Sequence, residues 1–260
     1  MKNRFVLMGV AALAAAGSSV FADAVNMRFV GTGAGRAVGV QFWVGSTKVM
    51  DGNYFVGSLN QQFSGTGLTG NTANSLDGRT LGTFCTDILE SVDTRWRVYD
   101  VVSAAQAPAT GGVSNAAMGA SRMSRLSQLY SYGMTTGMLN AFGAWANGDR
   151  TAGDNNDRAA AWQLLVWEIV FGDADAANWD LAGALRVAGL TNQVRNYFAQ
   201  FRDNSRGLTP GVDVSAVARL GAQDQLLVIV PLPPAAYAGM GMLGMVIGAG
   251  YIRRRRARLA

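Results

Sequence analysis

One stretch of fourteen residues, 158–171, restricts the possible folds most strongly. It reads Arg-Ala-Ala-Ala-Trp-Gln-Leu-Leu-Val-Trp-Glu-Ile-Val-Phe and is apolar around nearly its whole helical circumference. A helix of this kind has to be buried on several sides. The sequence therefore predicts a helix that lies inside the protein, against at least one other layer of secondary structure.

The rest of the chain changes from strand-like to helical patterns and back again. Segments rich in β-branched and aromatic residues predict strands at 24–30, 37–44, 54–56, 80–88, 96–102, 212–217 and 226–230. Further helices are expected from Ser121 and over 180–203, broken near 189–191. We expect one α+β domain over 25–230, a β-sandwich or barrel-like scaffold with a helical insert at about 121–203.

Two residue counts exclude most hydrolytic and metal chemistry. Histidine is absent and cysteine occurs once, at Cys85. The chain therefore has no Ser-His-Asp triad, no Cys-His pair, no zinc finger and no intramolecular disulfide. We expect a protein that is not an enzyme and has no cofactor and no metal site.

The positive net charge comes from the ends of the chain. Seven of the 22 basic residues are Lys2, Arg4 and five arginines after residue 252, which leaves 15 basic against 17 acidic residues elsewhere. The body is therefore slightly acidic, and nucleic acid is not an expected partner.

The first 24 residues have the pattern of a secretory signal peptide. Lys2 and Arg4 precede an uncharged apolar run, and small residues follow at its end. The apolar run is too short to span a bilayer comfortably. We expect export, with cleavage after Ala22 or Ala24.

The C-terminal segment 231–260 has the pattern of a membrane-spanning tail. Its uncharged stretch, 235–252, has eighteen residues and five glycines, about the minimum length for a spanning helix. Arg253, Arg254, Arg255 and Arg256 follow it and are expected to stay on the cytoplasmic side.

A short proline motif stands just before this span, made of Val230, Pro231, Leu232 and Pro233. The order of proline motif, Gly-rich span and arginine cluster resembles the PEP-CTERM sorting tail in its V-P-L-P variant. The resemblance implies cutting by a sorting peptidase of the exosortase type and a transient anchor in the inner membrane. The alternative is a permanent single-pass anchor.

Two side chains in the body are candidates for chemistry. Cys85 lies in an expected strand and is an inert buried residue, an intermolecular bridge or a nucleophile. Gln163 lies in the middle of the apolar helix, with Trp167 one turn further on the same face. A buried amide needs hydrogen-bond partners, and a bond to the neighbouring β layer would satisfy it without any chemistry.

The segments around these two residues resemble bacterial thioester domains. The resemblance rests on Phe84 and Cys85 followed by Asp87, and on Gln163 four residues before Trp167. It implies an internal thioester between Cys85 and Gln163, with Phe84, Asp87 and Trp167 around it. Trp162 and Leu165 stand where the family motif has Thr and Ala.

A second polar cluster, Asp149 and 154–157, lacks the ligand order of an EF-hand loop, and we expect it to cap a helix. The sequence thus predicts an exported protein of the cell surface or extracellular matrix. It is a covalent adhesin whose thioester captures an amine-bearing surface ligand, or a structural surface protein with the same fold and no covalent chemistry.

Overall fold

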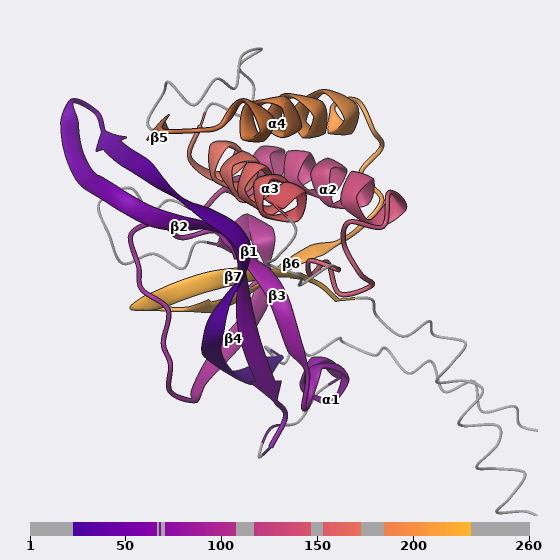
Figure 1. Cartoon of the computed structure of the whole chain (residues 1–260). Coiled ribbons are helices and arrows are strands. Elements are labelled where there is room, and N and C mark those ends of the chain that lie inside the picture. Colours follow the sequence, from indigo (N-terminus) through magenta and orange to yellow (C-terminus); the bar gives the residue numbers. More distant parts are fainter. Residues whose placement is uncertain are drawn as a thin grey trace, which may run out of the picture.

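The computed structural model describes residues 23–66, 68, 71–107, 117–146, 153–172 and 185–229. The fold is α+β, with a mainly antiparallel, sandwich-like sheet and its three longer helices gathered at one end (Figure 1). The expected signal peptide, apart from Asp23 and Ala24, lies outside the described residues. So do the proline motif, the apolar span and the arginine cluster. Among the described helices, none is both long enough and apolar enough to cross a bilayer.

The strands follow one another around a closed circuit of antiparallel pairings. In chain order they are β1 (Ala24–Val44), β2 (Thr47–Ser64), β3 (Thr80–Cys85), β4 (Arg97–Ser103), β5 (Leu185–Ala188), β6 (Val214–Arg219) and β7 (Ala222–Val228). The pairing order is β2-β3-β7-β6-β4-β1, and β1 pairs with β2 again. Every pairing is antiparallel, and tight turns join β1 to β2 and β6 to β7.

β1 and β2 are much longer than the strand segments that the sequence predicts. Together they form a hairpin whose outer half extends beyond the circuit as an arm (Figure 1). The pairing register shifts between Thr32 and Gly35, where β1 lies close to Gly57 of β2. A Cβ atom on Gly57 would lie 2.2 Å from the carbonyl oxygen of Ala34, so only glycine allows this approach.

Three helices pack together above the sheet: α2 (Gly119–Thr135), α3 (Gly153–Phe171) and α4 (Asn192–Ser205). The 3₁₀ turn η1 (Ala104–Gln106) contacts α2, whereas the short helix α1 (Asn71–Leu76) lies at the opposite end, against β1 and β2 (Figure 1). The prediction for α3 is confirmed, because every residue from Ala159 to Val170 is buried. α3 contacts β1, β2 and β3 on one side and α2 and α4 on the other.

The expected helical insert is present, with one exception. Leu185–Ala188 forms the strand β5, although the sequence predicts helix there. The strand pairs with Gly39–Phe42 in the arm. Four residues carry too little local pattern to predict this, and the pairing with the arm decides it.

The polar segment expected to cap the buried helix is part of that helix. Residues 153–157 form the first turns of α3. Asn155 accepts a hydrogen bond from the indole nitrogen of Trp145 at 2.9 Å, Asn156 accepts one from the backbone of Gly35 at 3.1 Å, and Asp157 pairs with Arg36. The last two contacts fix the start of α3 to β1, and the first fixes it to the segment that precedes the helix. Within the described ranges, no group of acidic or cysteine side chains is placed to hold a metal ion; Asp149 lies outside them.

Candidate functional site at the end of strand β3

The site forms where β2 separates from β3. The last residues that pair are Leu59 of β2 and Thr83 of β3. The part of β2 that precedes Leu59 in the sequence runs away from β3 and belongs to the arm. β3 extends two residues further, and at Cys85 its other edge pairs with Gln225 of β7. The expected strand 80–88 therefore ends early. The chain turns after Cys85, and a hydrogen bond from the backbone N–H of Leu89 to the Asp87 carboxylate supports the turn.

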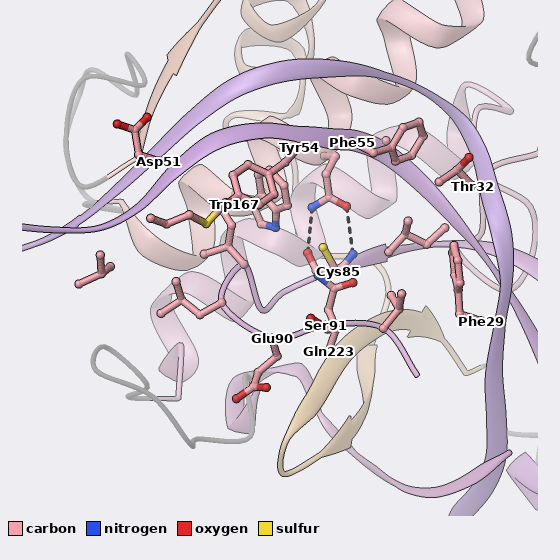
Figure 2. A pocket seen from close by; sticks show the side chains of 18 residues that line it. Phe29, Thr32, Asp51, Tyr54, Phe55, Cys85, Glu90, Ser91, Trp167 and Gln223 are labelled. Carbon is pink, nitrogen blue, oxygen red and sulfur yellow. Dashed lines mark hydrogen bonds between the residues drawn. The ribbon is translucent and has the colours of Figure 1, made fainter. Parts of the chain in front are cut away.

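The carboxamide of Gln163 occupies the edge position that β2 leaves. Its nitrogen donates to the carbonyl oxygen of Cys85 at 2.8 Å, and its oxygen accepts from the backbone N–H of Cys85 at 3.0 Å. The dashed lines in Figure 2 mark this pair of hydrogen bonds. Both bonds have the geometry of a neighbouring strand. The structure thus brings together the two residues that the sequence selects from positions 78 apart.

Both side chains are almost completely buried, with 3% of Cys85 and 1% of Gln163 exposed. Burial raises the pKa of the Cys85 thiol well above its usual range; the side chain of Trp167 opposes that rise, and the charge of Asp87 adds to it. The resting thiol is therefore neutral at physiological pH. The backbone N–H that donates to Gln163 polarises its carbonyl, which favours attack at the amide carbon.

The three other residues of the predicted surroundings have different positions. Trp167 lines the same pocket as Cys85 and Gln163 and lies beside Cys85 in Figure 2. Phe84 faces the opposite way, into the core, where its ring lies 5.6 Å from that of Trp145. Asp87 is buried behind the turn and does not line the pocket.

A pocket of about 700 Å³ connects the Cys85–Gln163 pair with the surface (Figure 2). The arm forms one wall, with Tyr54 and Phe55 among its residues, and Phe29 from the inner half of β1 adjoins it. The turn after β3 forms the other wall, with residues 88–92. The volume is large enough for an extended side chain from another molecule.

Two glutamines of β7 that the sequence analysis does not select support the end of β3 and the turn after it. Gln223 donates from its side chain to the carbonyl of Asp87 at 2.8 Å and from its backbone to Ser91 at 3.1 Å. Gln225 accepts from the hydroxyl of Thr83 at 2.8 Å. The one available signal was the run Gln-Asp-Gln inside a strand that ends in Leu-Leu-Val, because polar residues in such a place need buried partners.

The chain matches no known family model, no curated protein and no solved structure. The interpretation of the site therefore depends on its own geometry.

Proposed function

We propose that this protein is an exported surface or matrix protein in which Cys85 and Gln163 form an internal thioester. The main support is the pair of hydrogen bonds of 2.8 and 3.0 Å that holds the Gln163 carboxamide against the residue that carries the thiol. Because the two reacting residues are already held together in the folded chain, their reaction does not need the translational and rotational entropy that a collision between separate molecules costs.

The formation of the bond needs no external reactant. The sulfur of Cys85 attacks the amide carbon of Gln163, the C–N bond breaks, and the thiol proton leaves with the nitrogen as ammonia. The product is an acyl thioester, which reacts with nucleophiles. Because both residues are buried, water reaches the bond poorly, and this favours survival of the thioester.

The pocket gives an amine access to the same carbon. A primary amine on a surface ligand attacks the acyl carbon, the C–S bond breaks, and the proton from nitrogen ends on sulfur. The ligand is then joined to Gln163 through an amide bond, and Cys85 is a free thiol again. Each molecule reacts once, so the protein acts as a covalent adhesin and not as an enzyme.

The ends of the chain support the proposed location. The signal peptide directs export, and the V-P-L-P motif, apolar span and arginine cluster resemble a PEP-CTERM tail. We propose that the body is held at the inner membrane until an exosortase-type peptidase releases it to the surface.

A second function has its own support. Both polar atoms of the Gln163 carboxamide are hydrogen-bonded, and burial keeps the Cys85 thiol neutral. A structural surface protein would have the same features, with Gln163 acting only as a substitute for the missing strand neighbour.

Intact-mass measurement of the folded protein separates the two functions. The thioester protein is lighter than its sequence by one ammonia, and methylamine adds to Gln163 and exposes one titratable thiol. Cys85→Ala and Gln163→Glu both have their full sequence mass and take up no methylamine. Peptide mapping has to place the methylamide on Gln163, with Gln225 as the internal control. Full mass and a free thiol in the natively folded wild type would establish the structural function instead.

A further inference from the structure

The indole N–H of Trp167 is a buried donor that makes no well-aligned hydrogen bond among the described residues, although its side chain interacts with the sulfur of Cys85. Its nitrogen is shielded from solvent, the residue is 3% exposed, and no acceptor at hydrogen-bonding geometry occurs in the described part of the chain. A buried N–H without an acceptor costs about 1 to 3 kcal/mol. A group that remains in such a state calls for a functional explanation.

The position of this donor connects it with the sulfur. Trp167 follows Gln163 by one helical turn, so the two side chains leave α3 on the same face. Both line the pocket together with Cys85, and the Trp167 ring lies beside Cys85 in Figure 2. The side chain of Trp167 also lowers the pKa of Cys85 against the effect of burial, as a donor facing the sulfur does.

Building on the thioester proposed above, we propose that the indole N–H of Trp167 donates to the sulfur of Cys85 when an amine opens the bond. The negative charge that leaves the acyl carbon collects on this sulfur as the C–S bond breaks. A thiolate buried to this degree has little access to water, so its stability depends on protein donors. The thiolate then takes the proton released by the attacking amine, and the N–H of Trp167 returns to its resting state.

The proposed role differs from simple exclusion of water. A ring that only covers the bond can be replaced by another aromatic ring with little effect on the intrinsic reactivity of the sulfur. A ring that donates a hydrogen bond cannot be replaced by phenylalanine in this way, because stabilisation of a developing charge by one hydrogen bond changes a rate by about 10- to 100-fold.

The test compares Trp167→Phe with Trp162→Phe in the full chain. Trp162 is the matched control, because it belongs to the same helix and is fully buried, but its side chain interacts with Tyr130 and does not line the pocket. We expect both variants to form the thioester, and the methylamine reaction to slow by about 10- to 100-fold only in Trp167→Phe. Mass separates the methylamide from the acid that hydrolysis would give, so leakage of water is measured independently.

A second readout is the pKa of the Cys85 thiol after methylamine has opened the bond, measured by the pH dependence of its alkylation. We expect this pKa to be higher in Trp167→Phe than in wild type and in Trp162→Phe. Asp87 and Asp224, the charged groups that also act on this thiol, are unchanged in all three proteins.

Equal methylamine rates, or an unchanged thiol pKa, in Trp167→Phe would overturn the donor role while leaving the thioester in place. A wild-type protein of full sequence mass would overturn the thioester and the donor role together.

Discussion

At the scale of the single residue, Gln163 explains why the end of β3 is ordered. Its carboxamide satisfies the backbone N–H and C=O of Cys85, which would otherwise be buried without partners after β2 has turned away. The side chain therefore has a structural effect as long as it remains a carboxamide, because thioester formation removes the nitrogen that donates to the Cys85 carbonyl.

Gln163→Ala is expected to lower the free energy of unfolding by about 3 to 5 kcal/mol, because it leaves two buried backbone groups unpaired and opens a cavity. Gln200→Ala, on the exposed face of α4, is the control and should change it by less than about 0.5 kcal/mol. Chemical denaturation measures both. Equal small effects would mean that the Cys85 backbone finds other partners.

Asp87 gives stability a defined dependence on pH. Burial raises the pKa of its carboxyl above the ordinary value of 3.8. The folded state therefore binds the proton more tightly than the unfolded state. The stability that protonated Asp87 contributes is fully present below pH 3.8 and is lost as the pH rises through the pKa of the folded state. Asp87→Asn should abolish this loss of stability at higher pH. The difference between the melting temperature of the variant and that of the wild type should therefore increase from roughly pH 4 to pH 7.

Asp51→Asn is the control with the opposite sign. The hydrogen bond from Lys48 lowers the pKa of Asp51, so this carboxylate stabilises the protein above its ordinary pKa and stops doing so as the pH falls. If the melting temperatures of wild type and Asp87→Asn changed in parallel with pH, the pH effect could not be assigned to Asp87.

At the scale of the element, the arm creates the pocket. The first half of β2 belongs to the arm and its second half belongs to the closed circuit of strands. The boundary between the two halves is at Gly57. The backbone of Gly57 has φ of 154° and touches Ala34 and Gly35 of β1. This close crossing sets the direction in which the arm leaves β3.

Gly57→Ala should therefore destabilise the fold by about 2 to 4 kcal/mol, through backbone strain and the contact with the Ala34 carbonyl. Gly45→Ala at the tip of the arm also has a positive φ, 58°, but its Cβ meets nothing within 4 Å, and we expect about 1 kcal/mol. Denaturation midpoints give both values. A Gly57→Ala protein as stable as Gly45→Ala would show that the crossing is not tight.

At the scale of the whole molecule, the folded domain includes Asp23. The carbonyl of Asp23 accepts a hydrogen bond from the backbone of Val101 at 2.7 Å, and its carboxylate accepts one from the hydroxyl of Thr72 at 2.6 Å. Ala24 pairs with Asp100 in β4. Of the two expected cleavage sites, only the one after Ala22 retains these contacts.

From the proposed export, we expect a mature chain that begins at Asp23, as N-terminal sequencing of the protein from its native host would establish. A chain that begins at Val25 should unfold about 1 to 3 kcal/mol more easily than one that begins at Asp23, because it lacks both hydrogen bonds and the first pair of β1 with β4. Equal stabilities, or a mature chain that begins at Val25, would refute the assignment.

The elements with a strong local pattern were predictable from the sequence. The helix over 158–171 had to be buried because it has no polar face, and the structure confirms it as the C-terminal fourteen residues of α3. The α+β class followed from the change of period along the chain. Cys85 and Gln163 were selectable because each is a reactive or polar side chain in an apolar segment.

The contacts between these elements depended on the tertiary structure. The short strand β5, the turn after Cys85 and the support from Gln223 all depend on partners distant in sequence. The separation of β2 from β3 is likewise set by a glycine crossing with β1, which no local pattern reports. Periodicity fixes which face of an element is buried, but only packing decides which partner covers it, and here packing placed the Gln163 carboxamide on Cys85.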